Sequence, residues 1–214
     1  MLLSRPINTV PVTFDTVLFI WGFHFFSFLD AVTMSTTEHR DTLNGAWILD
    51  KTKEPWSMKH YLEIMNVDPM AIEAHEKGEK EHDTIHTITM DAQKVTIVKR
   101  SRVNNDLVVT LDFDQELIVH LPPGDRPKKS LATSRDPTHL EIRHTMQTIN
   151  GFAQVTDIKH LQQEEGSQRT YLVQSLTIHN QQTGRSATTT RYFLPYTPPP
   201  PTADDAATTA AAKK

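Results

Sequence analysis

The histidines are the first residues of this chain whose number and spacing suggest chemistry. The sequence holds 11 histidines and no cysteine, so a metal or haem site would rest on imidazole without thiolate. His82 and His86 are four residues apart, and on a helix this spacing puts two imidazoles on one face. The residues around them are instead typical of the start of a β-strand, where residues four apart are separated by roughly 13 Å. We therefore expect no metal site and no cofactor.

Signatures of catalysis are missing from the sequence. It contains no Gly-rich phosphate loop, no G-x-S-x-G elbow and no paired-carboxylate motif. The absence of cysteine also removes thiol nucleophiles and disulfides, and it fits a reducing compartment such as the cytoplasm. The net charge of -4 and the pI near 6.2 argue against a surface that follows nucleic-acid phosphates. We expect a cytoplasmic protein that catalyses no reaction and binds no nucleic acid.

Arginines within β-strands are the remaining candidates for chemistry. A carboxylate buried in a protein interior costs several kcal/mol unless a cation pairs with it, and the arginine fork can meet both of its oxygens. An aliphatic tail needs no particular partner, because each buried methylene contributes ~0.8 kcal/mol. A protein interior that holds such a carboxylate would therefore need inward-facing arginines. Arg143 and Arg191 both lie in strand-like stretches.

The first part of the domain combines one strand with two helices. Trp47 to Leu49 is typical of a strand. Glu54 to Val67 places apolar side chains at helical spacings. Asp68 followed by Pro69 predicts the cap and the first turn of a second short helix.

From Lys80 onward the sequence consists of short runs rich in Thr, Val and Ile. The runs are DTIHTITMD, KVTIVKRSRV, DLVVTLDFD, ELIVHLP, KKSLATS, HLEIRHTMQTI, AQVTDIKHLQ, TYLVQSLTIH and SATTTRYF. Turn-forming residues separate them, among them NND, PPGD, NG and NQQTG. Together with the first strand, these nine runs make ten strands, and no helix interrupts the nine. This order predicts an antiparallel up-and-down β-barrel, because closure removes the exposed edges of a flat sheet. The expected fold is all-β, with a short helix pair between the first and second strands.

The two ends of the chain differ from its middle. Residues 1–40 form an N-terminal extension whose apolar run, Val17 to Leu29, is shorter than the roughly 20 residues of a membrane-spanning helix. This extension is either a targeting or anchor segment or, if translation starts at Met34, no part of the mature protein. Residues 197–214 are rich in Pro, Ala and Thr and predict a disordered tail. The folded domain is thus expected at residues 41–196.

Four local patterns, in this order, resemble the intracellular fatty-acid-binding proteins, a family of lipocalin-like (calycin) β-barrels. Gly45-Ala46-Trp47 resembles the Gly-x-Trp of that family, and Tyr61 to Val67 is similar to the end of its first helix, with Asn66 in place of a glycine. Gly124 to Ser130 resembles its Asp-Gly-Arg-x-x-Lys-Ser turn, and Thr190 to Phe193 resembles its closing Thr-Arg-x-Tyr. Lipocalins proper place their helix after the strands and usually carry disulfides. The resemblance therefore favours a divergent fatty-acid-binding protein.

The resemblance also implies a ligand site. Arg191 matches the arginine on the last strand that contacts the ligand carboxylate, and Phe193, on the same face, stands where the family has a tyrosine. The match to the family's second arginine is His160, which binds a carboxylate through charge only when it is protonated. Arg143 is the alternative source of that charge, and Gln147, on the same strand face, resembles a polar interior residue of the family.

The helix pair would cover one mouth of the barrel and, by the resemblance, form the portal for the ligand. The portal residues are Trp56, Met58, Tyr61, Met65 and Met70. Lys51, Lys53 and Lys59 lie near this portal, so a transient contact with an anionic membrane is a further expectation. The alternative is that these lysines form an ordinary solvated face.

Three functions remain open. The leading one is non-catalytic binding and intracellular transport of fatty acids or similar small hydrophobic ligands by a monomer. The second is haem binding in a related barrel, although of the longer Gly-rich motif of haem-binding relatives only Gly45-Ala46-Trp47 is present. The third is an interaction protein of the same fold whose barrel is filled by its own side chains.

Overall fold

A computed structural model describes residues 39–101, 104–121, 125–133, 136–148 and 151–198. The expectations for the N-terminal extension, including Val17 to Leu29 and Met34, concern residues outside this described part, as do those for the tail from residue 199. Among the described helices, none is long and apolar enough to cross a membrane.

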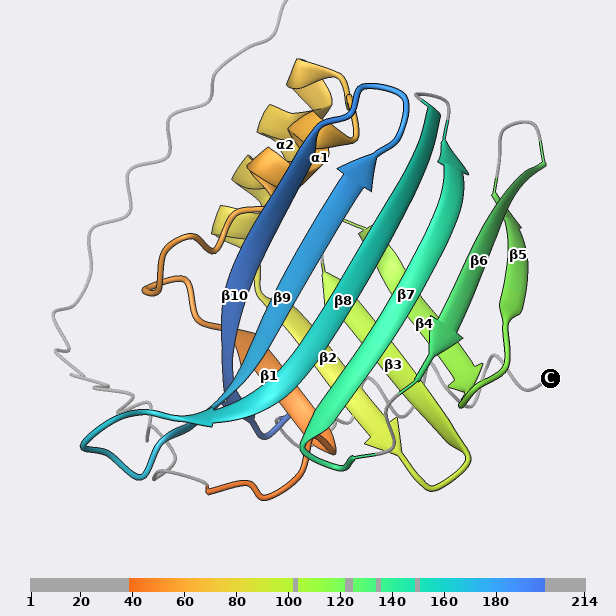
Figure 1. Ribbon diagram of the computed structural model, residues 1–214. Helices are drawn as coiled ribbons and strands as arrows, with labels where there is room; N and C mark the ends of the chain where they lie inside the picture. The colour runs from red at the N-terminus through yellow and green to blue at the C-terminus, as the bar shows by residue number, and fades with distance from the viewer. Residues whose placement is uncertain (1–38, 102–103, 122–124, 134–135, 149–150, 199–214) are drawn as a thin grey trace, which may run out of the picture. The chain divides into compact units, whose positions relative to one another are not determined.

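Ten antiparallel strands form one sheet that curls into a nearly closed barrel (Figure 1). The strands are β1 (Gly45–Leu49), β2 (Thr84–Met90), β3 (Lys94–Ser101), β4 (Asn104–Asp112), β5 (Leu117–Leu121), β6 (Arg126–Ala132), β7 (His139–Thr148), β8 (Gly151–Gln163), β9 (Thr170–Asn180) and β10 (Ser186–Tyr196). The helices are α1 (Lys59–Ile64) and α2 (Pro69–Glu81). The predicted all-β barrel with a helix pair between the first and second strands is confirmed.

Closure of the barrel depends on β1, which pairs with β2 on one side and with β10 on the other. The strands therefore follow the order β4-β3-β2-β1-β10-β9-β8-β7-β6-β5. β4 and β5 stand at the two ends of this order. Just beyond β4, Phe113 forms a bridge with Ala132 of β6, and the backbone N–H of Asp114 donates to the Ala132 carbonyl at 2.9 Å. These contacts bring the two ends of the sheet together.

The first helix is shorter than the predicted run from Glu54 to Val67, since α1 begins only at Lys59. Pro55 disfavours helical backbone at the residue before it. At the helix start, Ser57 Oγ accepts a hydrogen bond from the Lys59 N–H at 3.0 Å. Residues 54–58 therefore form an irregular segment between β1 and α1. Trp56 of this segment packs against buried residues of the barrel interior.

The end of α1 depends on Asn66, whose φ of 57° is left-handed. The Asn66 N–H donates to the Glu63 carbonyl at 3.0 Å and the Val67 N–H donates to the Leu62 carbonyl at 3.1 Å. These bonds satisfy carbonyls that a helix end otherwise leaves open. Asparagine tolerates this conformation better than most non-glycine residues, which fits a position where the family motif has a glycine.

The predicted start of the second helix is confirmed as well. The Asp68 carboxylate accepts a hydrogen bond from the Met70 N–H at 2.9 Å, and Pro69 is the first residue of α2. In Figure 1 the two helices lie beside the ends of β9 and β10, and α1 packs against both strands.

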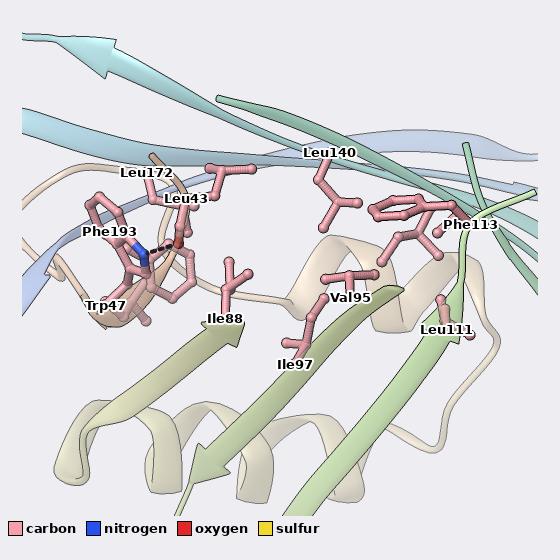
Figure 2. Close-up of a cluster of buried hydrophobic side chains, with 13 residues drawn as sticks. Leu43, Trp47, Ile88, Val95, Ile97, Leu111, Phe113, Leu140, Leu172 and Phe193 are labelled. Carbon is pink, nitrogen blue, oxygen red and sulfur yellow. Dashed lines mark hydrogen bonds between the residues drawn. The ribbon is translucent and has the colours of Figure 1, made fainter. Parts of the chain in front are cut away.

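The barrel interior contains two apolar clusters. The larger one gathers around Trp47 and Phe193 (Figure 2), where the indole Nε1 of Trp47 donates to the Leu43 carbonyl at 2.8 Å. The smaller one lies under α1, where Ile64 packs with Ile178 and Val155.

A polar band separates the two clusters. Along β8, Val155 belongs to the smaller cluster, Asp157 and Lys159 are buried polar residues, and Leu161 packs against the larger cluster. Along β9 the same order appears in Leu176, Gln174 and Leu172. The strands thus pass from apolar to polar to apolar surroundings, and the polar band is where an interior site with chemistry lies.

Candidate ligand-binding cavity

The polar band is organised around the carboxylate of Asp157 on β8. Lys159, two residues further on the same strand face, places its Nζ 2.6 Å from Asp157 Oδ2. From β9, Gln174 Nε2 donates to Oδ1 at 3.0 Å and to Oδ2 at 3.1 Å. Lys99 on β3 approaches the same carboxylate at 3.9 Å. Asp157 is therefore a fixed anion with two cations and one amide around it.

This arrangement changes how both partners ionise. Burial opposes ionisation of Asp157, but the ammonium groups of Lys159 and Lys99 outweigh it and hold the pKa of Asp157 well below its usual range. Burial lowers the pKa of Lys159, against the attraction of Asp157.

A second ion pair joins helix α2 to the barrel wall. Arg191 on β10 donates from one guanidinium nitrogen to Glu79 of α2, and its Nε donates to the Trp56 carbonyl at 3.0 Å. Arg191 and Glu79 are both only 4% exposed. Thr84 Oγ1 also donates to the Glu79 carboxylate at 3.3 Å. The irregular segment before α1 and the last turn of α2 thus meet at one buried arginine.

A cavity of about 470 Å³ opens beside this ion pair. Its lining contains polar side chains, among them Arg191, Glu79, Lys99 and Gln174, and apolar ones such as Leu176. The complete lining is Met58, His75, Glu79, Thr84, His86, Lys99, Arg100, Ser101, Leu107, Gln174, Leu176 and Arg191. The cavity therefore lies between α2 and the inner face of β2, β3, β4, β9 and β10, and it combines apolar surface with buried charge.

Two interior histidines are held neutral. His86 stacks on Phe193 with 4.6 Å between ring centres, and burial, reinforced by Lys99, keeps its pKa well below its usual range. Burial lowers the pKa of His144 to about 3, and its Nδ1 lies 2.8 Å from Ser130 Oγ. In the described part of the chain, no group of three or more metal-binding side chains comes together. These imidazoles serve as neutral hydrogen-bonding and stacking groups.

Several buried polar atoms at the cavity lack a hydrogen-bond partner within the described residues. They are His75 Nδ1, Glu79 Oε2, His86 Nδ1 and Gln174 Oε1. All four belong to residues that line the cavity. Buried polar atoms in native proteins are usually hydrogen-bonded, so their concentration at one cavity indicates a place that receives a polar group.

Known proteins match this chain in structure and not in sequence. No protein-family model matches the chain, and no curated protein matches its sequence. A fatty acid binding protein of Schistosoma mansoni in complex with arachidonic acid matches with a TM-score of 0.50 and 15% identity, over 75% of this chain and 100% of that chain. An abundant heat soluble (SAHS) protein of Ramazzottius varieornatus matches with a TM-score of 0.50 and 12% identity, over 75% and 100% of the two chains. The chain has the fatty-acid-binding-protein fold.

Within this fatty-acid-binding-protein fold, the structure brings two of the predicted ligand residues to the interior. Arg191 lines the cavity, and Phe193 lies in the larger apolar cluster directly against His86. Arg191 already has a carboxylate partner in Glu79. The ring of Phe193 supplies stacking surface, and the Arg191 guanidinium lies 5.5 Å from its centre.

The other three predicted ligand residues lie on the outer face, so their assignment to the interior is wrong. On β8 the buried residues are Asp157 and Lys159, and the half-buried His160 therefore points the opposite way, opposite His139 on β7. Arg143 is exposed and pairs with Glu141 at 2.6 Å. These residues contribute to the surface of the barrel.

The orientation of Gln147 follows from the alternation of side chains along β7. Its neighbour Met146 is buried in the smaller apolar cluster, so Gln147, Arg143 and Thr145 share the outer face. The prediction that Arg143 and Gln147 lie on one strand face is confirmed, but the face is the outer one.

The predicted portal residues lie mostly where the helix pair meets the barrel. Trp56 packs against the larger apolar cluster, while Met58, Tyr61 and Met65 pack against the smaller one. Burial raises the pKa of Tyr61 to about 12. Met70 is 79% exposed on the first turn of α2, outside both apolar clusters.

The three lysines near the helices are engaged within the chain. Lys51 Nζ donates to the Lys80 carbonyl at 3.2 Å and to the His82 carbonyl at 2.8 Å. Lys53 pairs with Glu164 at 3.1 Å, and Lys59 lies 3.8 Å from Glu76. Lys51 thus caps the end of α2, which is a structural role.

The residues that sequence reasoning missed are Glu79, Lys99, Asp157, Lys159 and Gln174. A signal existed for two of them. On β8 the buried face runs through Ala153 and Val155, and continuing that two-residue period leads to Asp157 and Lys159. The sequence offered no comparable signal for Glu79, because its partner Arg191 is 112 residues away in the chain.

Proposed function

We propose that this chain binds a fatty acid or a similar small hydrophobic ligand with an acidic head group in the cavity beside Arg191, as a non-catalytic carrier in the cytoplasm. The observation that supports it most directly is the cavity itself, whose lining combines apolar side chains with the buried Arg191 and with Lys99. Its volume of about 470 Å³ is in the range of ligand-binding cavities.

The charges of the interior favour an anionic head group. Cations there are Lys99, Lys128, Lys159 and Arg191, whereas the carboxylates are Asp157 and Glu79. Each carboxylate is already committed to a close cation. One further anion reduces the remaining excess of positive charge, because like charges in a low-dielectric interior repel strongly.

The aliphatic part of the ligand needs only apolar contact. Met58, Leu107 and Leu176 supply it at the cavity. Each buried methylene contributes ~0.8 kcal/mol, so an acyl chain of ordinary length outweighs the cost of association. The fatty acid binding protein of Schistosoma mansoni in complex with arachidonic acid shares the fold, which supports the same ligand class for this chain.

Lys99 provides the test of head-group recognition. It lines the cavity, and its nearest carboxylate is shared with Lys159, which lies closer. We expect Lys99→Met to weaken the binding of oleic acid by about tenfold, or ~1.4 kcal/mol, and to leave that of oleyl alcohol nearly unchanged. The measurement is displacement of a fluorescent fatty-acid probe by each ligand.

The matched control is Lys94→Met, which removes the same charge from the exposed start of the same strand. It is expected to bind both ligands as the unmodified protein does. Failure of oleic acid to displace the probe from the unmodified protein would refute the proposed function. If Lys99→Met lost equal affinity for the acid and the alcohol, the role of the lysine in recognising the head group would be refuted.

A further inference from the structure

We propose that Glu79 of α2 occupies Arg191 in the absence of ligand, and that an acidic ligand binds by exchanging its own carboxylate for that of Glu79, which releases the last turn of α2 from the barrel. This inference rests on the proposed function, because it concerns how the same cavity admits its ligand. It makes Glu79 the residue that decides between acidic and neutral amphiphiles.

The geometry presents Glu79 as an internal substitute for a ligand head group. Its Oε1 accepts from Arg191, both residues are almost fully buried, and both line the cavity. A carboxylate that enters the cavity reaches a space lined by the same guanidinium. Arg191 also keeps its bond to the Trp56 carbonyl at 3.0 Å, so the guanidinium stays in place while its anion changes.

Exchange avoids the main cost of opening this ion pair. A buried arginine that loses its carboxylate is left as an uncompensated charge, which is strongly unfavourable. An incoming carboxylate replaces the lost partner, and Arg191 remains paired throughout. An alcohol cannot do this, because its hydroxyl carries no charge. The cavity therefore admits an alcohol only where it does not disturb Glu79.

Glu79 is a poorly satisfied occupant of the arginine. Its second oxygen, Oε2, is buried and has no hydrogen-bond partner within the described residues. His75 Nδ1 lies 4.0 Å from it, which is too far for a hydrogen bond. Glu79 also sits in the last turn of α2, which ends at Glu81. The partial negative charge of a helix C-terminus disfavours a carboxylate there. A ligand carboxylate that uses both oxygens has an advantage over it.

The exchange acts on α2 because, among the described elements, this helix packs mainly on α1. The packing of the helix pair on β9 and β10 comes from α1. Ser57 holds α2 through Glu76 at 2.6 Å, and Lys51 caps its last carbonyls. Loss of the Glu79 contact therefore loosens the last turn of α2 while its connection to α1 persists.

The test compares Glu79→Gln with Glu81→Gln in the full chain. Both variants remove one negative charge from the last turn of α2, but Glu81 is exposed. We expect Glu79→Gln to bind oleic acid at least tenfold more tightly than the unmodified protein, because the internal competitor is gone, and to bind oleyl alcohol within twofold. Glu81→Gln is expected to leave both affinities unchanged. Probe displacement measures all of these affinities.

Amide hydrogen exchange gives the second readout. In the unmodified protein, oleic acid should speed the exchange of residues 77–82 at least threefold, and oleyl alcohol should not. In Glu79→Gln this segment should already exchange fast without ligand. If Glu79→Gln unfolds, Glu79→Asp, whose shorter side chain cannot hold Arg191 in the same way, should show the same gain for the acid.

The outcomes separate this inference from the proposed function. If the unmodified protein binds oleic acid and Glu79→Gln or Glu79→Asp gains nothing, the exchange is refuted while the proposed function stands. Slower exchange in α2 with oleic acid would refute it in the same way. If the unmodified protein binds no oleic acid at all, both are refuted.

Discussion

Asp157 and Lys159 form an ion pair that is closed off from solvent inside the barrel. Placing two charges in a protein interior costs several kcal/mol each, and the attraction between them offsets that cost only with good geometry and further hydrogen bonds. Gln174 supplies two such bonds to Asp157. This pair therefore contributes a fixed polar centre to the barrel interior more than it contributes stability.

The interior histidines predict how stability depends on pH. In the unfolded chain their pKa is the ordinary 6.5, whereas burial lowers that of His144 to about 3 and that of His86 well below its usual range in the folded protein. As the pH falls below 6.5, protons bind the unfolded chain first, so the free energy of unfolding decreases. We expect a loss of about 2 kcal/mol or more between pH 7 and pH 5, measured by urea unfolding.

The matched variants for this prediction are His144→Leu and His179→Leu. His144 is interior, and its removal is expected to take away part of the loss at pH 5. His179, which bonds Ser186 on the outer face of β9, provides the control for removing a histidine outside the interior. Equal profiles for His144→Leu and the unmodified protein would show that this histidine does not titrate on unfolding as described.

At the scale of the elements, turn chemistry determines where the helix pair ends and begins. Asn66 adopts a φ of 57° at the end of α1. Residues with a branched side chain are strained in this conformation, and glycine is not. We expect Asn66→Val to be less stable than Asn66→Gly by ~1 kcal/mol or more, measured by urea unfolding. Equal stability of the two variants would mean that the backbone relaxes out of the left-handed region at no cost.

The sequence predicted the elements well because their signals are local. Asp68 and Pro69 mark the start of α2, and residues such as Asn180 and Gly184 form the turn between β9 and β10. The shortening of α1 was not predicted, because apolar residues at helical spacing continue through residues 54–58, whereas Pro55 and the contact of Trp56 with Arg191 keep this segment irregular.

The site was predicted only in part, because its register and its long-range pairs are not local properties. Arg191 follows from a motif, and it does line the cavity. His160 was placed inside by a match that is off by one residue, and in a strand such a shift moves a side chain to the opposite face. Its neighbour Lys159 is the buried cation on that strand. Glu79 could be found only from the three-dimensional structure.

At the scale of the whole barrel, two apolar clusters enclose a charged middle. The lining of the cavity includes residues of α2 and of β4. β4 is the strand at one end of the sheet order. Among the described strands, β4 pairs in the sheet with β3 alone, as an end strand of the order does.

Native mass spectrometry of the protein, purified without denaturation and then mixed with oleic acid, tests ligand binding most directly. We expect a complex of one chain with one fatty acid, either already present after purification or formed on addition, and a weaker complex with oleyl alcohol. Only unliganded protein, with or without added oleic acid, would contradict ligand binding and would favour a barrel whose interior charges are satisfied by its own side chains.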